Sequence, residues 1–431
     1  MPSQIDDLVH DDDVAVAADF LDYLRENSLD PPGVSRASFG PGERMAHARL
    51  AEVARCLGLV LQTDFVGNLF VTQPGWDPSL PVVMIGSHLD AVPHGGNFDG
   101  AAGVAIGLGI LAGLRRRGAR PARGVTLLAI RAEEMSWFPT HYIGSRAGFG
   151  LLPADALENV FRFDSGRSLA SHMAEEGFEP ERVAKGEASL VAAKIHAYIE
   201  PHIEQGPVLV DAGIAVGIVT GIRGNVRYRN CRVCGTYGHA GAVPRVARRD
   251  AVMAATAFVQ EIEGYWLAQE AASADFVATV GQFFTSASQH TITKISGEVH
   301  FTLDMRSENN AVLMAAHAHL STKAREIAEA RHVSIDLGPH THAQAATMDG
   351  DLRARLRRLA VAHGIPAMEL PSGGGHDCAT FANQGVPSAM VFIRNDRAAI
   401  IRTRPWRSRI WRRRCGLSRR SSTRSPFEPA A

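Results

Sequence analysis

The spacing of apolar residues along the first part of the chain alternates between the period of a helix and that of a strand. Two mainly apolar segments, at 82–85 and 124–131, predict buried strands. The small-residue run 100–114 between them predicts a helix. Further helices are expected over 14–27 and 41–57, and further strands near 59–65 and 68–72. Strands that alternate with helices indicate an α/β fold with a doubly wound sheet.

The pattern changes over 212–337, where the order becomes strand, helix, strand, strand, helix, strand. These elements are expected near 214–236, 247–264, 276–284, 295–306, 309–329 and 332–337. The order is that of a split βαβ, ferredoxin-like layer, so we predict an inserted α+β domain. The α/β character returns over 338–397, with a helix near 350–363 and a strand over 388–393. Residues 1–211 and 338–397 are therefore predicted to form the two parts of one domain.

Composition argues against several classes of function. The 431 residues carry a formal net charge of zero, which gives no support for nucleic-acid or membrane partners. No apolar run approaches the roughly 20 residues of a membrane span, and the acidic start, with Asp6 and Asp7, does not fit a secretory signal. Five scattered cysteines fit a reducing compartment, so we expect a cytoplasmic protein. Cys231 and Cys234 lie on a predicted strand that turns their thiols to opposite faces, which argues against a zinc ribbon.

The strand at 82–85 leads into residues that can bind a metal. His88 follows it and Asp99 lies at the start of the next helix, so both are expected at the carboxyl edge of the sheet. A neutral imidazole and a carboxylate that meet there form a zinc-type ligand pair. Asp90 can fix the imidazole tautomer. The alternative is an aspartate that caps a helix beside an unrelated histidine, but the intervening Gly-Gly-Asn-Phe-Asp-Gly and the ligands downstream favour the metal site.

Two adjacent carboxylates follow the strand at 124–131. Glu133 and Glu134 can divide the work of a metal site, since one can bind the ion while the other takes a proton from water. The alternative is solvated surface charge. The apolar strand before the pair, and the aromatic residues Trp137 and Phe138 after it, favour a cleft.

Two shorter segments carry polar residues whose role the spacing alone leaves open. His202 lies in the polar run 199–207, where a surface histidine is the plain alternative to a ligand. A triple glycine at 373–375 precedes His376. It lacks the Lys-Ser/Thr of a P-loop, so we favour backbone that closely approaches a substrate.

The last stretch, 398–431, differs from everything before it. It holds ten arginines, two tryptophans and a single acidic residue, without helical or strand periodicity. We interpret it as an out-of-frame reading of a GC-rich gene. Codons can be chosen so that the neighbouring frame encodes Gly-Asn-His-Thr-Asn-Pro and then a plausible helix. The alternative is a genuine basic tail, although a tail that binds nucleic acid would usually contain lysine.

With these segments assembled, the chain resembles the hydantoinase/carbamoylase family of zinc amidohydrolases, which includes N-carbamoyl-L-amino acid hydrolases, β-ureidopropionases and allantoate amidohydrolases. The likeness runs from about residue 15 to residue 396. Its motifs are Gly-Ser-His-Leu-Asp at 86–90, Gly-Gly-Asn-Phe-Asp-Gly at 95–100, Glu133-Glu134, His-Ile-Glu-Gln-Gly-Pro at 202–207, Gly-His-Ala-Gly at 238–241, Phe-Thr-Leu-Asp-Met-Arg at 301–306 and Gly-Gly-His-Asp at 374–377. The motif at 202–207 is the specific one, because related peptidases have a carboxylate in place of its histidine.

The resemblance implies two divalent metal ions, zinc or else manganese or cobalt, bridged by Asp99. His88 and His202 would complete the protein ligands of one ion and Glu134 would bind the other. Glu133 would be the general base that helps a zinc-activated water to attack a ureido or amide carbonyl. A carbamoyl substrate would give ammonia, carbon dioxide and the amino acid.

The resemblance also implies residues that hold the substrate. Arg306 would bind a substrate carboxylate, His376 would contact the scissile group, and Gln205 would be a further contact. His239 would reach in from the inserted domain of a partner subunit as the oxyanion donor, so the implied assembly is a homodimer. The insertion would then serve as a lid and dimerisation domain.

Departures from the family keep alternatives open. Thr293 stands where relatives have an asparagine that touches the substrate carboxylate, so the motifs do not choose among ureido and amide acids. Relatives end with a histidine that binds the second ion, and no histidine follows His376 here. The alternatives are a related aminoacylase or dipeptidase, and a member that keeps the fold as a binding or dimerising partner with impaired activity.

Overall fold

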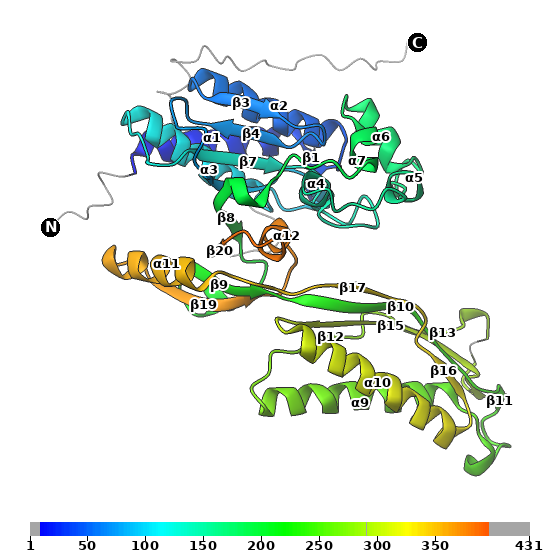
Figure 1. Cartoon of the computed structure of the whole chain (residues 1–431). Coiled ribbons are helices and arrows are strands. Elements are labelled where there is room, and N and C mark those ends of the chain that lie inside the picture. The colour runs from blue at the N-terminus through cyan, green and yellow to red at the C-terminus, as the bar shows by residue number, and fades with distance from the viewer. Residues whose placement is uncertain (1–8, 290, 396–431) are drawn as a thin grey trace, which may run out of the picture. The chain divides into compact units, whose positions relative to one another are not determined.

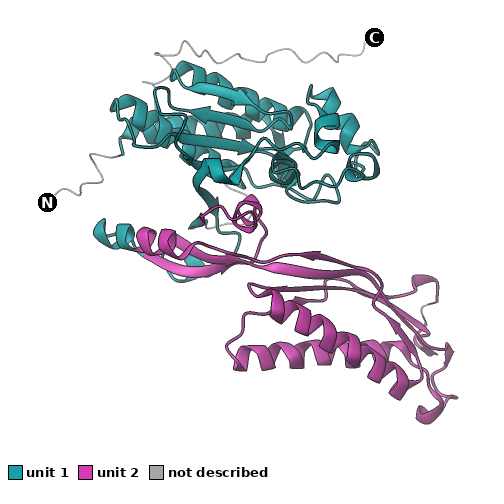
Figure 2. Ribbon diagram, in the orientation of Figure 1, with its two compact units in different colours: residues 1–216, 358–366, 390–431 teal, residues 217–357, 367–389 magenta. Residues whose placement is uncertain are grey.

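A computed structural model describes residues 9–289 and 291–395. The chain forms two compact units, which Figure 2 distinguishes by colour. Among the described residues, the first consists of 9–216, 358–366 and 390–395, and the second of 217–289, 291–357 and 367–389. The arginine-rich tail predicted after residue 397 lies outside the described residues.

A mixed sheet forms the centre of the first unit (Figure 1). Its described strands lie in the order β20-β8-β5-β7-β4-β3. They are β3 (Val60–Thr63), β4 (Leu69–Thr72), β5 (Val82–His88), β7 (Val125–Ile130), β8 (Ile195–Ile203) and β20 (Ser388–Ile393), the last belonging to this unit from Met390 on. β5 pairs in parallel with β7 and β8, whereas β4 pairs antiparallel with β7 and β3. The strands predicted before residue 132 are confirmed.

The central strand β8 is absent from the elements that the sequence pattern predicts. Its segment contains a proline and two histidines, and proline removes a donor from the strand ladder. The strand is nevertheless buried, because its polar groups find partners. Glu200 is fully buried and accepts hydrogen bonds from the hydroxyl groups of Ser87 at 3.1 Å and Tyr198 at 3.4 Å.

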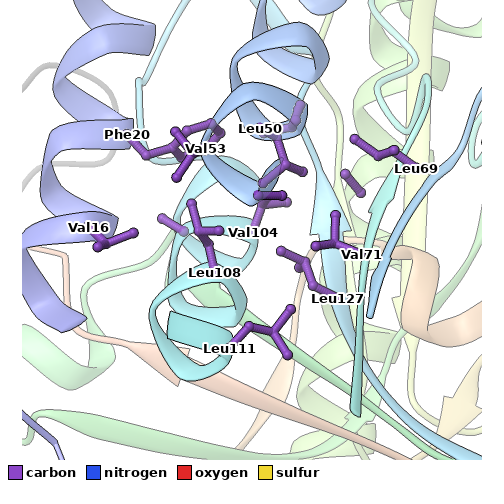
Figure 3. Close-up of a cluster of buried hydrophobic side chains, with 14 of the residues drawn as sticks. Val16, Phe20, Leu50, Val53, Leu69, Val71, Val104, Leu108, Leu111 and Leu127 are labelled. Carbon is purple, nitrogen blue, oxygen red and sulfur yellow. The ribbon is translucent and has the colours of Figure 1, made fainter. Parts of the chain in front are cut away.

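Three helices cover one face of this sheet: α1 (Asp11–Asn27), α2 (Pro41–Cys56) and α3 (Ala101–Arg116). Buried side chains such as Phe20 of α1 and Leu108 of α3 pack with Val71 and Leu127 of the sheet (Figure 3). Helix α3 approaches the sheet closely, since a Cβ atom at Gly103 would lie only 2.1 Å from the carbonyl oxygen of Pro201. This contact sets the start of α3 against β8.

Shorter elements complete the first unit. They are α4 (Ile143–Gly148), α5 (Ala156–Asn159), α6 (Leu169–Glu175), α7 (Pro180–Ala184), a 3-10 turn (Ala192–Lys194), α8 (Val208–Asp211), and the small sheet of β1 (Leu29–Asp30), β2 (Gly33–Arg36) and β6 (Ala91–Gly95). A second core cluster, which includes Phe39, Phe65 and Phe138, packs around the segment that follows β7. That segment carries the predicted glutamate pair.

An antiparallel sheet and two helices form most of the second unit. The sheet order is β12-β15-β10-β16, with β13 on β15 and β17 on β10. The elements are β10 (Gly224–Cys234), α9 (Ala251–Ala271), β12 (Val277–Thr279), β13 (Phe283–Thr285), β15 (Glu298–Ser307), α10 (Asn310–Arg331), β16 (Ser334–Asp336) and β17 (His340–Ala343). Their order confirms the predicted α+β layer. The helices pack on the sheet through residues such as Phe258, Leu320 and Phe301.

The strand predicted over 214–236 is two strands, because the chain breaks at Arg223 between β9 (Val216–Ile222) and β10. The second unit runs on to Arg357, since β17 pairs with β10 and β18 (Ala346–Thr347) pairs with β9. The predicted insertion limits of 212 and 337 stay predictions. The remaining elements are β11 (Gly238–His239), a second 3-10 turn (Arg245–Ala247), a third (Ala287–Gln289), β14 (Lys294–Ile295), α11 (Gly350–Ala362), β19 (Ala367–Ser372) and α12 (Asp377–Asn383).

None of the described helices combines the length and apolar character that a membrane span requires.

Candidate metal centre

His88 is the last residue of β5 and is almost fully buried. Its Nδ1 atom lies 3.2 Å from the Oδ1 atom of Asp90 and 3.1 Å from the carbonyl oxygen of the same residue. Its Nε2 atom lies 3.8 Å from an Oε atom of Glu133. A proton on Nδ1 can be held by Asp90, so Nε2 is the nitrogen that would bind a metal ion.

Asp99, just before α3, and His202, near the end of β8, lie side by side. Asp99 precedes α3, and its Oδ1 atom lies 3.2 Å from Nε2 of His202 in β8. The Nδ1 atom of His202 lies 2.9 Å from the carbonyl oxygen of Ile203, which fixes this ring in the same way. The amide of Gln205 donates to the other Asp99 oxygen at 2.8 Å. Gln205, predicted as a substrate contact, thus also orients a candidate ligand.

The ligand atoms converge in two groups that share a histidine. One consists of His88, Asp99 and His202, and the other of His88, Glu133 and Glu134. Within each group, ligand atoms lie within 4.8 Å of one another. Imidazole nitrogen and carboxylate oxygen are the donors that zinc accepts in catalytic sites, so these residues fit a divalent metal.

The electrostatics of the site favour a bound cation. Burial raises the pKa of the Glu134 carboxyl to about 7, and the negative charges of Asp99 and Asp90 act in the same direction against the attraction of His88. Burial would lower the pKa of His88, but the carboxylates of Glu133 and Asp90 raise it well above its ordinary value. These carboxylates are crowded into a buried space and need positive charge there, which a divalent ion supplies.

Asp90 is the centre of the hydrogen-bond network behind the ligands. It is fully buried and binds the imidazole of His88. Its carboxylate also accepts the backbone N–H groups of Glu133 at 3.2 Å and Glu134 at 3.1 Å, and the hydroxyl of Ser38 at 2.6 Å. One carboxylate thus ties the end of β5 to the glutamate pair after β7. Nearby, the indole N–H of Trp137 donates to the carbonyl oxygen of Ala91 at 2.8 Å.

Arg36 is a buried cation that sequence analysis does not find. It is fully buried, and its hydrogen-bond acceptors are all neutral: Ser28, Leu89 and Asn97. Burial lowers its pKa to about 10, while the negative charge of Asp90, among others, opposes that shift. The guanidinium therefore joins the segments that carry His88 and Asp99. No local sequence pattern predicts this role, since β2 is a short strand in which buried and half-buried residues alternate as in many strands.

Three predicted residues lie in the second unit. The Arg306 guanidinium on β15 donates to both oxygens of Asp304, at 3.1 and 2.9 Å. His376 directly precedes α12 and is buried, and its Nε2 atom lies 3.0 Å from the hydroxyl oxygen of Ser372. His239 is exposed on β11. The other seven predicted residues, namely His88, Asp90, Asp99, Glu133, Glu134, His202 and Gln205, lie together in the first unit.

A side chain at Gly100 would have no room beside the candidate ligand His88. The glycine's φ of +61° is left-handed, and a Cβ atom there would lie 2.4 Å from Cε1 and Nε2 of His88. We expect Gly100→Ala to displace the imidazole and to lower the zinc content of the purified protein. Backbone strain alone should cost about 1–3 kcal/mol.

Gly118 provides the matched control for this prediction. It has the same φ of +61° but no atom within 4 Å of its added Cβ. Gly118→Ala should therefore show the backbone cost in thermal unfolding and keep its zinc. Equal zinc content in the two variants, measured by atomic absorption, would contradict the close-approach argument.

Comparison with known proteins identifies the family to which the chain is similar. The chain matches the sequence profile of Peptidase family M20/M25/M40 over residues 84–404. An N-carbamoyl-L-amino acid amidohydrolase of Geobacillus stearothermophilus is 35% identical over 364 residues, which are 84% of this chain and 86% of that protein. An allantoate amidohydrolase of Escherichia coli is 31% identical over 376 residues, 86% of this chain and 88% of that protein.

Solved structures agree with the sequence relatives. A hydantoinase/carbamoylase family amidase from Burkholderia multivorans superimposes with a TM-score of 0.80 at 26% identity, covering 89% of this chain and 90% of that one. A hydantoinase/carbamoylase family amidase from Burkholderia ambifaria superimposes with a TM-score of 0.75 at 32% identity, covering 88% of this chain and 90% of that one. The chain belongs to the hydantoinase/carbamoylase amidohydrolases of the M20 family.

Membership in this amidohydrolase family confirms the resemblance found in the sequence motifs, and the α/β architecture with a separate antiparallel sheet. It makes the chain a family hydrolase that acts on C–N bonds, and M20 proteins typically bind divalent metals, which agrees with the His, Asp and Glu cluster. The names of the relatives differ in substrate, so the family by itself does not fix which amide is cleaved.

Proposed function

We propose that this amidohydrolase cleaves the C–N bond of an N-carbamoyl amino acid or an allantoate-like ureido acid. The observation that carries the proposal is the buried convergence of His88, Asp99 and His202 beside the adjacent pair Glu133 and Glu134. The relatives named for N-carbamoyl-L-amino acids and allantoate, at 35% and 31% identity, support the ureido class.

The residues divide into two ligand sets. His88, His202 and Asp99 would hold one divalent ion, and Asp99 with Glu134 would hold the other. Bound there, the ions would supply the positive charge that acidifies a water molecule and polarises the scissile carbonyl. Zinc is the metal we favour for this donor set, with manganese and cobalt as alternatives.

Glu133 is the proposed proton carrier. Its carboxylate is buried and lies beside the Nε2 atom of His88, while its backbone N–H is held by Asp90. It accepts a proton from the attacking water and delivers it to the departing nitrogen, so one group serves both halves of the reaction. Hydrolysis of an N-carbamoyl amino acid with one water then yields ammonia, carbon dioxide and the free amino acid.

Three further residues are proposed as substrate contacts. Arg306 presents a planar guanidinium, the group best suited to a substrate carboxylate. Its pairing with Asp304 fixes its orientation before substrate arrives. His376 and Gln205 are proposed to contact the scissile group and its surroundings.

An aminoacylase or dipeptidase is the competing activity, since it would use the same water and base. His202 argues against it, because related peptidases have a carboxylate there. A panel of N-carbamoyl amino acids, allantoate, N-acetyl amino acids and dipeptides, run with zinc, manganese and cobalt in turn, tests the proposal. Faster cleavage of the acetyl or peptide substrates would overturn it, and metal-loaded protein without turnover would identify an impaired member.

We also propose a homodimer in which His239 acts on the partner's substrate. The motivation is that His239 is exposed on β11, in a different unit from every candidate ligand. Mixing inactive His239→Ala subunits with inactive Glu133→Gln subunits should restore part of the turnover, because each hybrid contains one intact combination. Absence of recovery in verified hybrids would assign His239 to its own subunit or to no catalytic role.

The second ion should bind more weakly than the first. His376 is the last histidine in the sequence, so the proposed second set has only the carboxylates of Asp99 and Glu134. Titration of the apoprotein with zinc should show one tight ion and a second that is lost on gel filtration. Two tight ions, together with an intact reading frame when the gene is sequenced across codons 390–415, would refute both this prediction and the out-of-frame interpretation of the tail.

A further inference from the structure

Glu43 is a fully buried carboxylate that the proposed reaction does not use. It lies in the first turn of α2, and all its hydrogen bonds come from groups near the metal centre. One oxygen accepts the backbone N–H of Ala132 at 2.8 Å. The other accepts the backbone N–H of Phe39 at 2.7 Å and an Nη atom of Arg131 at 3.1 Å. The carboxylate thus joins the start of α2 and the turn before it to the segment that follows β7.

Both backbone donors belong to residues in an uncommon conformation. Phe39 has a φ of +47° and Ala132 a φ of +51°, in the left-handed region that residues other than glycine seldom adopt. Such backbone persists only where its surroundings fix it. Both residues are buried, so water cannot satisfy their N–H groups, and Glu43 supplies the acceptor for each.

Each of these two turns leads directly to Asp90. Phe39 follows Ser38, whose hydroxyl donates to Asp90 at 2.6 Å. Ala132 precedes the pair whose backbone N–H groups donate to the same carboxylate. Glu43 therefore holds both segments that donate hydrogen bonds to Asp90. The turn at Ala132 also sets the direction in which the side chain of the next residue, Glu133, leaves the backbone.

We infer that Glu43 is a positioning residue that fixes the left-handed turn at Ala132 and thereby aims the carboxylate of Glu133. The inference rests on the proposed function, in which Glu133 is the general base. Beyond that function, the inference states that a side chain on α2 controls proton transfer without contacting substrate or metal. A merely structural Glu43 would neutralise the buried Arg131 and affect stability alone.

The central experiment compares Glu43→Gln with wild type as zinc-loaded protein. An amide offers an acceptor on one side only. Its oxygen is expected at the position that faces two donors, the N–H of Phe39 and the guanidinium of Arg131, so its NH2 group faces the N–H of Ala132, which loses its acceptor. We expect kcat to fall about 10- to 100-fold, the scale of a slightly misplaced catalytic group. KM should change less than about threefold and zinc content should stay the same. An unchanged kcat would overturn the inference.

Asp13→Asn is the matched control. Asp13 is also a buried carboxylate that pairs with an arginine, Arg116, and with a backbone N–H, that of His10. Arg116 ends α3 and the metal centre lies at its start, about 24 Å away for a 16-residue helix. This variant should lose stability and keep kcat. A similar loss of kcat in both variants would mean that general destabilisation explains Glu43→Gln.

A double-mutant cycle separates action through Glu133 from an independent effect. In a Glu133→Gln background, Glu43→Gln should cost less than about twofold, because the group that it aims is gone. A full additional loss would overturn the inference. If Glu133→Gln itself leaves turnover intact, the proposed function fails. If Glu133→Gln is inactive and Glu43→Gln is unaffected, only the positioning role fails.

An amide-exchange measurement keeps the inference testable without turnover. Exchange of the Ala132 N–H should be at least about tenfold faster in Glu43→Gln than in Asp13→Asn, since only the former removes its acceptor. If Glu43→Gln does not fold, the double variant with Ala132→Gly should recover the fold, because glycine adopts a positive φ without a brace. Equal exchange in the two single variants, or no recovery by glycine, would overturn the inference.

Discussion

Glu133→Gln should retain its metal and lose about two to four decades of turnover, the usual scale for removing general-base catalysis. The amide is nearly the same size as the carboxylate and keeps the backbone N–H that Asp90 holds. It cannot accept the proton of the attacking water. The measurement is kcat on the best substrate of the panel, with zinc content determined on the same sample.

Glu134→Gln is the paired variant that decides between the two neighbours. Its side chain is half-buried, and the charges of Asp99 and both histidines act on its pKa, as expected of a ligand. It should lose zinc together with activity. If zinc is lost from Glu133→Gln and kept in Glu134→Gln, the assignments of base and ligand are reversed.

Asp99→Asn should release both ions and reduce turnover by about three decades or more, since the proposed bridge contributes to both ligand sets. The substitution keeps the shape of the side chain and removes the charge that faces Nε2 of His202. Zinc content per subunit after dialysis is the direct readout. A variant that still holds two ions would exclude Asp99 as a bridging ligand.

Gln205→Ala is the control for this result. It removes the N–H donor that orients Asp99 at 2.8 Å but no ligand atom. Loss of such an orienting contact usually weakens metal binding by about 10- to 100-fold rather than abolishing it. The two variants should therefore differ clearly in zinc retained at equal dialysis times.

The parts of the site that the sequence could predict are those encoded by one short segment. The apolar run at 82–85, shortly before His88, predicts a strand whose end carries a ligand, and Glu133 and Glu134 closely follow a second predicted strand. Local pattern is sufficient there because strand, strand end and ligand are contiguous. The small-residue helix between the strands brings Asp99 to the same edge, as expected.

The parts that could not be predicted depend on contacts between distant segments. Arg36, Ser38 and Glu43 lie in a short strand, a loop and a helix start, where polar residues are ordinary. Only the packed structure shows that their side chains are buried against the ligand segments. His202 is an intermediate case, since Glu200 and Pro201 interrupt the apolar pattern of its strand, and only the family motif indicated a ligand.

Trp137 gives this site a built-in optical probe. Its indole is nearly buried and donates to the backbone one residue after Asp90, and it follows Glu134 by three positions. The emission of such a ring depends on the field and the solvent around it, and both change when a divalent charge enters a cluster of carboxylates. The difference between the spectra of wild type and Trp137→Phe would isolate this signal from that of the other tryptophans. Metal loading of the intact protein could then be followed in real time, without labels or substrate.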